Sequence, residues 1–215
     1  MRKKELNLYK FAKEVHENAV NHGWWDGDRS YAEICALIHS EWSEALEEYR
    51  SDKPMAYKVC TAGVEFCDCD GHPHADQHSV CVNDKKCIYR QPKPEGIAVE
   101  LIDGCIRILD YLGMVDYLFF PLDIRSRFNL ISEHRKEKIN TFSLPELIAK
   151  LHVCVSESYT YSTLGEIKDA YEALDEAMII ACYWLMKQGV DVESIMLEKH
   201  EYNKNRPYRH GGKKI

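Results

Sequence analysis

Apolar side chains recur every three to four residues along most of this chain of 215 residues. That interval places them on one face of an α-helix, so the pattern predicts a series of amphipathic helices. Ser30, Ser143 and Thr163 each stand three residues before a Glu, which is the pattern of a capping box, and Asp191 is a further cap. The helical segments expected are residues 4–21, 30–50, 96–119, 143–159, 163–188 and 191–202. The expected fold class is therefore all-α.

Three stretches depart from this pattern. Residues 51–95 are rich in Cys, His, Asp, Gly and Pro and carry no sustained period, which indicates an inserted loop or a small subdomain. Residues 120–141 indicate a polar connector with a basic cluster. The basic tail from residue 199 onward is either a disordered end or an arm that contacts phosphate or a base.

The helix expected over 30–50 carries a carboxylate inside its apolar face. At 100° per residue, Glu41 falls on the stripe that holds Ile38, Trp42 and Ala45, and Glu44 lies at the edge of that stripe. Most acidic residues of helices form a solvated face. An unpaired carboxylate on a core-facing stripe costs several kcal/mol, so Glu41 is expected to be paired or to bind a metal.

The segment 96–119 is apolar nearly all round, which is typical of a buried helix. Its single polar sector holds Glu100, Asp103, Arg107 and Asp110, and that sector is expected to face an internal site or a paired partner. Arg107 could neutralise Asp103 four residues earlier on the same face. That pair would still leave Glu100 and Asp110 to be explained.

Charge and composition narrow the choice of partners. The net charge is −7 and no long basic run occurs, which argues against nucleic acid as a partner. A small phosphorylated ligand stays compatible, because a bound metal reverses the local field. The N-terminus lacks an apolar signal core, and no apolar run approaches the roughly 18 residues of a membrane span. We expect a soluble, cytoplasmic protein with no membrane partner.

The cysteines fall into two groups. Cys35, Cys105, Cys154 and Cys182 lie singly in helical patterns and are expected to pack as small hydrophobes. The other five crowd into one segment with three histidines, where metal binding or free thiols are favoured over disulfides. The candidate zinc ligands are Cys60, Cys67, Cys69, Cys81 and Cys87.

Two acidic pairs on neighbouring helices are the strongest chemical signal. Glu41 and Glu44 share one helix face, as do Glu100 and Asp103, because residues three apart lie side by side. Four converging carboxylates would repel one another unless a cation lay between them. Oxygen ligands of this kind suit Mg²⁺, which is typically bound together with substrate phosphates.

The second half of the chain partly repeats the first. His39-Ser-Glu41-Trp-Ser-Glu44 aligns with His152-Val-Cys-Val-Ser-Glu157, and Glu100-Leu-Ile-Asp103 aligns with Glu172-Ala-Leu-Asp175. The pattern suggests a half at 1–119 that contains the insertion 51–95, and a degenerate half at 120–215. Chance similarity between amphipathic helices is the alternative. A true repeat predicts a pseudo-two-fold bundle completed within one chain, and otherwise a homodimer is possible.

The two acidic motifs, together with the tail Lys199…Asn203…Arg206-Pro…His210-Gly-Gly-Lys213, resemble the MazG-like all-α nucleoside triphosphate pyrophosphohydrolases, which include dimeric dUTPases. The resemblance covers about 30–50, 96–119 and the C-terminus, and the spacing between its motifs is longer than usual. It implies Mg²⁺, or Mn²⁺ in its place, held by Glu41, Glu44, Glu100 and Asp103. It also implies hydrolysis of a nucleoside triphosphate to the monophosphate and pyrophosphate.

Roles for further residues follow from that chemistry. A spare carboxylate, Glu48 or Asp110, could orient or deprotonate the attacking water. Lys199, Arg206 and Lys213 could stabilise the departing pyrophosphate. The expected substrate-binding set is Trp24, Trp25, Lys199, Asn203, Arg206, His210 and Lys213. Trp24 and Trp25 could equally be packing anchors, and the sequence does not identify the base.

Two other functions remain open at this stage. The first is a zinc-stabilised binding module centred on 51–95, although its cysteines lack paired C-x-x-C spacing. The second is a catalytically inactive helical interaction protein, in which the acidic residues only form salt bridges.

Overall fold

The computed structural model describes residues 5–59 and 92–212. Its elements are α1 (Leu8–Asn21), α2 (Tyr31–Arg50), β1 (Tyr57–Val59), β2 (Lys93–Glu95), α3 (Ile97–Met114), α4 (Ile124–Leu130), α5 (Glu133–Asn140), α6 (Leu144–Leu164), α7 (Ile167–Lys187), α8 (Val192–Lys204) and α9 (Arg209–Gly212). Helices dominate, so the all-α expectation is confirmed at the level of fold class. The short strands β1 and β2 were not expected.

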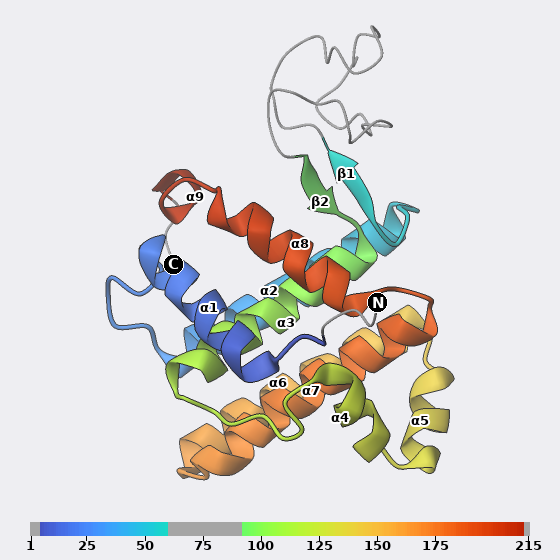
Figure 1. Ribbon diagram of the computed structural model, residues 1–215. Coiled ribbons are helices and arrows are strands. Elements are labelled where there is room, and N and C mark those ends of the chain that lie inside the picture. Colours follow the sequence, from blue (N-terminus) through green and yellow to red (C-terminus); the bar gives the residue numbers. More distant parts are fainter. Residues whose placement is uncertain (1–4, 60–91, 213–215) are drawn as a thin grey trace, which may run out of the picture.

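The long helices pack as two pairs, α2 with α3 and α6 with α7 (Figure 1). The pairs contact each other through α2 against α6 and α3 against α7, and α1 and α8 both pack on α3. Apolar side chains from both halves of the chain join one hydrophobic cluster. The central helix is α3, which is buried nearly all round, as its sequence predicts.

A glycine allows α2 and α3 to approach closely. A Cβ at Gly104 would overlap the indole of Trp42, which is fully buried and donates a hydrogen bond from Nε1 to the Leu101 carbonyl oxygen over 3.2 Å. The side chain of Trp42 therefore lies directly against the α3 backbone. This contact sets the acidic motif of α2 beside the acidic motif of α3.

Most helix starts follow their sequence signals. The capping boxes at Ser30 and Ser143 both form, and Asp191 caps α8 by accepting from the Ser194 N–H. The box expected at Thr163 is wrong. Helix α6 continues to Leu164 and ends at Gly165, which has φ +81°, and α7 begins without a side-chain cap. The left-handed conformation that Gly165 accepts ends the helix two residues past Thr163.

The expected connector at 120–141 is also wrong, because it contains two short helices. Asp123 caps α4 and Ser132 caps α5, each by accepting a backbone N–H three residues later. Helix α5 has one buried residue, Ile139, so its sequence lacks the apolar period of a longer helix. Helix α3 ends at Met114, five residues before the expected end at residue 119.

The two ends of the insertion pair with each other. Strands β1 and β2 are antiparallel, with Tyr57 opposite Glu95 and Val59 opposite Lys93. The chain between them therefore leaves and re-enters the bundle at one place. The candidate zinc ligands Cys60, Cys67, Cys69, Cys81 and Cys87 lie outside the described residues.

The cysteines of the helices behave as expected. Cys35, Cys105, Cys154 and Cys182 are free thiols buried in the core, and the Cys105 and Cys182 sulfurs lie 4.0 Å apart. Within residues 5–59 and 92–212, no helix has the length and apolar character needed to cross a bilayer.

Candidate functional site

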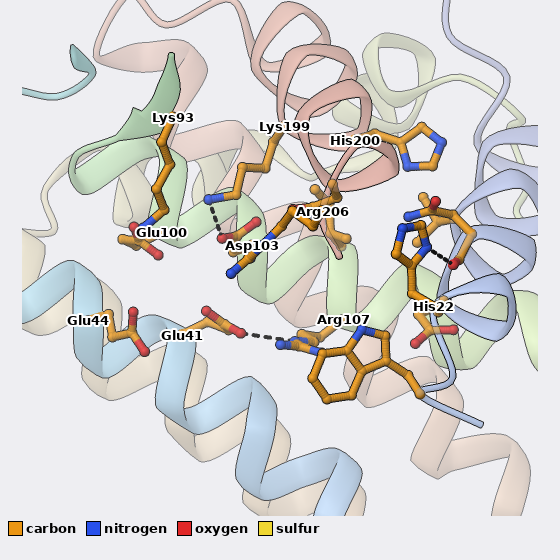
Figure 2. Close-up of a pocket in the computed structure, with 17 residues that line it drawn as sticks. His22, Glu41, Glu44, Lys93, Glu100, Asp103, Arg107, Lys199, His200 and Arg206 are labelled. Atoms are coloured by element: carbon orange, nitrogen blue, oxygen red, sulfur yellow. Dashed lines mark hydrogen bonds and ion pairs between the residues drawn. The ribbon is translucent and has the colours of Figure 1, made fainter. Parts of the chain in front are cut away.

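A cavity of about 170 Å³ opens where α1, α2, α3, α8 and β2 meet. Its lining is strongly charged. The acidic side chains are Glu41, Glu44, Glu100, Asp103 and Asp110, and the basic ones are Lys93, Arg107, Lys199 and Arg206. Figure 2 shows the acidic residues of α2 on one side of the cavity and Lys93 and Lys199 on the other.

Three of the four expected metal ligands converge. Carboxylate oxygens of Glu41, Glu44 and Glu100 lie within 4.8 Å of one another. Glu41 and Glu44 share one face of α2, and Glu100 reaches them from the first turn of α3. Glu44 is exposed, whereas Glu100 is only 4% exposed. The group therefore combines one solvent-facing and two sheltered carboxylates.

The ion pairs of the site differ from the expected one. Arg107 does not neutralise Asp103 on its own helix; its Nε lies 2.9 Å from Glu41 Oε1 on α2. Asp103 instead pairs with Lys199 of α8, with 2.6 Å between Nζ and Oδ2. A cation from another helix thus holds Asp103, which explains why Asp103 is not part of the three-carboxylate group.

Burial gives these carboxylates an unusual electrostatic state. It raises the pKa of Glu100 to about 9, assisted by the charge of Asp103 and by a hydrogen bond with Glu95 and opposed by the charge of Lys199. Burial also raises the pKa of Glu41, and the opposing charge of Arg107 offsets that rise only in part. Without a cation, Glu100 is therefore protonated at neutral pH.

Some site residues have no signal in the sequence. Lys93 and Glu95 come from β2, at the end of the insertion, and form an ion pair with each other. Lys93 lines the cavity, and Glu95 bonds to Glu100. These two residues follow a stretch that has no helical period, so the sequence gives no signal for their position. The pairing of β1 with β2 brings them to the site. Asn18 and His22 of the α1 region also line it.

The two candidates for orienting water, Asp110 and Glu48, both have hydrogen-bond partners. Asp110 accepts hydrogen bonds from Trp25 Nε1 over 3.0 Å and faces His16 Nδ1 at 2.8 Å. Glu48 bonds to the hydroxyl of Tyr57, although its Oε2 has no hydrogen-bond partner within the described ranges, and it is not among the described residues that line the cavity. Asp110 is therefore less free than the sequence suggested, and Glu48 lies outside the cavity lining.

The adjacent tryptophans have separate surroundings. Trp24 is buried and lines the cavity, and the Arg107 guanidinium lies 5.8 Å from its ring centroid. Trp25 packs edge-on against His16 and donates its N–H to Asp110. Trp24 is thus both a packing anchor and a wall of the cavity, whereas Trp25 supports Asp110.

The C-terminal segment is docked against the molecule. Lys199, Asn203 and Arg206 line the cavity. Arg209 donates its backbone N–H to the His22 carbonyl oxygen over 3.0 Å, and Tyr208 hydrogen-bonds to Asp26. The side chain of His210 and all of Lys213 lie outside the described part of the chain. The described part of the tail is therefore an ordered arm beside the cavity.

Replacing Gly23 with Ala is expected to release this arm. Gly23 has φ +76°, and a Cβ there would overlap the ring of Tyr208. Gly165 is a matched control, because its φ is +81° but its Cβ would meet nothing within 4 Å. Both substitutions should cost about 1–2 kcal/mol of backbone strain. Only Gly23→Ala should accelerate amide exchange at residues 206–212, and equal exchange in both variants would contradict the docking.

The second acidic set does not form a comparable cluster. Glu157 and Glu172 are exposed, and Glu172 pairs with Lys168 on its own helix. Asp175 is buried and bonded to Arg127 and Tyr117. Among the residues described, the three carboxylates near α2 and α3 are the group with metal-ligand spacing.

No protein-family model, curated protein or solved structure matches this chain. The site is therefore interpreted from its own chemistry. Carboxylate oxygens that lie close together suit a hard divalent cation. Lysine and arginine side chains beside them suit phosphate oxygens. The arrangement can therefore bring a cation and a phosphorylated ligand to one place.

Proposed function

We propose that this protein is a Mg²⁺-dependent nucleoside triphosphate pyrophosphohydrolase, which converts a ribo- or deoxyribonucleoside triphosphate to the monophosphate and pyrophosphate. The observation that carries the proposal is the convergence of Glu41, Glu44 and Glu100 beside Lys93, Lys199 and Arg206. The resemblance of both acidic motifs to the MazG-like enzymes supports the same activity.

The donor set fits the metal. All three ligands are carboxylates, the donors that Mg²⁺ and Mn²⁺ take, and no cysteine or histidine is among them. Asp103 would complete the expected set only by exchanging its ion pair with Lys199. The raised pKa of Glu100 indicates that the site holds a proton which a cation can displace. When bound, Mg²⁺ would neutralise triphosphate charge and polarise the α-phosphorus.

The chain's own residues supply the remaining steps. Water attacks the α-phosphorus, the bond from that phosphorus to the bridging oxygen breaks, and a proton is released from the water. Arg206 and Lys93 bind phosphate oxygens and stabilise the charge on pyrophosphate as it departs. Arg107 orients Glu41. Asp110 already holds two hydrogen-bond donors and Glu48 does not line the cavity, so the attacking water is not assigned to either.

A tandem arrangement accompanies this proposal. His39 and His152 are equivalent in the sequence repeat, and their rings stack with centroids 4.8 Å apart where α2 meets α6. Ser43 and Ser156 make matching bonds to the His39 and His152 carbonyl oxygens. Contact between equivalent residues is what a two-fold axis produces. We propose that the chain forms a MazG-like bundle in this way, with one equipped site.

Release of pyrophosphate from a panel of ribo- and deoxyribonucleoside triphosphates tests the activity. The wild-type chain should cleave at least one nucleotide with Mg²⁺ or Mn²⁺ and none after chelation. Failure to cleave any nucleotide would favour the inactive interaction protein, which the ion pairs of Glu41 and Asp103 fit. Elemental analysis of the purified protein tests zinc separately, and less than a trace would mean that the five candidate cysteines are free thiols.

The pH dependence of the metal-free protein is a further prediction. The ordinary pKa of Glu100 is 4.5, and it is about 9 in the folded state. The folded state therefore keeps a proton that the unfolded chain releases. Stability from this group is full below pH 4.5 and is lost as the pH rises through 9. Urea unfolding in a chelator should show this fall, and Glu100→Gln should flatten it.

Metal binding should show the opposite trend. Because Mg²⁺ requires the deprotonated carboxylate, its affinity should rise by about tenfold per pH unit below the Glu100 pKa, with one proton released. Calorimetric titration in buffers of different ionisation enthalpy measures that proton. An affinity that is independent of pH between 7 and 9 would contradict the raised pKa.

A further inference from the structure

Two polar atoms of α8 face the cavity without a partner. His200 is 2% exposed and Asn203 is half-buried, and both line the cavity. Within the described ranges, His200 Nε2 and Asn203 Oδ1 are buried and have no hydrogen-bond partner. Buried polar groups nearly always have a hydrogen-bond partner in folded proteins. Two such atoms without a partner in one cavity therefore indicate that they bind a ligand.

These atoms differ in character from the phosphate-binding side chains. Burial lowers the pKa of His200 to about 4, so its imidazole is neutral at physiological pH, and Asn203 carries no charge. The three clustered carboxylates lie on the other side of Arg206. Figure 2 shows His200 and His22 on one side of that arginine and Glu41, Glu44 and Glu100 on the other. We call the end with the three carboxylates the ionic end and the end with the uncharged His200 and Asn203 the neutral end; Arg107 and Asp110 line the cavity as well.

The neutral end also has apolar walls. Val15 and Ala19 of α1 and the ring of Trp24 line the same cavity, and Phe11 packs edge-on against the His200 ring, with centroids 5.2 Å apart. His22 faces the Asn18 carbonyl oxygen through Nδ1 at 2.8 Å. Flat apolar surfaces with a few fixed polar atoms are the usual environment of a bound heterocycle.

We propose that His200 and Asn203 form the subsite that recognises the nucleobase. This inference rests on the proposed function, because a nucleoside triphosphate whose phosphates meet the ionic end brings its base toward the neutral end. Asn203 Oδ1 accepts an N–H of the base, and His200 Nε2 pairs with a neighbouring polar atom on the same edge. Each base presents its own pattern of such donors and acceptors. A base that leaves either atom unpaired binds less tightly.

Binding without metal tests the subsite separately from hydrolysis. The four nucleoside 5′-monophosphates, in ribo and deoxy forms, and ribose 5-phosphate are titrated calorimetrically into the full chain in a chelator. The wild type should prefer one base by at least about tenfold, since each unpaired atom costs roughly that factor. His200→Phe and Asn203→Leu should each remove the preference while leaving the affinity for ribose 5-phosphate unchanged.

Both variants are chosen so that the protein still folds. His200→Phe keeps an aromatic ring against Phe11, and Asn203→Leu keeps the size of a half-buried side chain. A preference that survives in both variants overturns the subsite, as does equal binding of all four bases. Variants that change only the ratio of ribo to deoxy forms would assign these atoms to the sugar and overturn the base assignment. Base-selective binding without any pyrophosphate release would refute the hydrolase and keep the subsite.

Discussion

Glu100→Gln is expected to lower Mg²⁺-dependent pyrophosphate release by about 10³-fold or more without unfolding the protein. A bound cation contributes several kcal/mol of transition-state stabilisation, and each 1.36 kcal/mol corresponds to about tenfold in rate. Glutamine is a close match for the protonated form, which burial favours at this position. The substitution therefore keeps the hydrogen bond with Glu95 and removes the negative charge that a metal needs.

The matched control is Glu47→Gln on the same helix as Glu41. Glu47 is exposed and pairs only with Arg50 among the described residues, three positions later. Its loss should change both rate and stability very little. Pyrophosphate release, Mg²⁺ affinity and urea unfolding are measured for both variants. Glu100→Gln with the wild-type rate would exclude Glu100 as a ligand, and an unfolded Glu100→Gln would contradict its protonated state.

The sequence predicts much of this site because burial and chemistry conflict at particular positions. Glu41 stands on an apolar stripe, and Glu100 lies in the one polar sector of a buried helix. Both positions prove sheltered, and both carboxylates reach one cluster. The sequence also predicts the start of a helix correctly where a capping residue and the apolar period agree, as at Ser30 and Ser143.

The remaining features depend on contacts between distant segments, which helical periodicity does not encode. Arg107 could pair with Asp103, four residues earlier on its own helix, or with Glu41 on α2. The packing of α2 against α3 determines that it pairs with Glu41. Lys93 has no local signal, because it reaches the cavity through strand pairing. Helices α4 and α5 are too short to display a clear period. Sequence patterns therefore predict the elements and the acidic motifs, but not the partners of the charges.

The ion pair of Asp103 has consequences for the proposed metal site. Lys199 takes Asp103 out of the carboxylate group, so three clustered carboxylates remain where the motif offers four. Burial tends to lower the pKa of Lys199, but the charge of Asp103 and the hydrogen bond to that carboxylate oppose this, and the pKa is raised. Lys199 thus stays charged while it is 2% exposed. The fourth carboxylate of the motif is thus held in an ion pair between α3 and α8.

Lys199→Met is expected to destabilise the metal-free protein by about 3–5 kcal/mol. Methionine fills much of the space of the lysine, so the loss comes mainly from leaving Asp103 partly buried without its cation. Unfolding in urea with a chelator measures the change. Lys204→Met is the control on the same helix, since Lys204 is exposed and pairs with Glu201 three residues earlier. That change should cost less than about 1 kcal/mol.

A second substitution separates charge from packing. Lys199→Met combined with Asp103→Leu removes both charges, and replacing a whole buried ion pair by apolar side chains is often neutral. The double variant should therefore recover most of the stability that Lys199→Met loses. Mg²⁺ should also stabilise Lys199→Met more than wild type, because the released Asp103 carboxylate becomes available as a fourth ligand. A double variant as unstable as Lys199→Met would show that packing around Lys199, not its ion pair, holds α8 against α3.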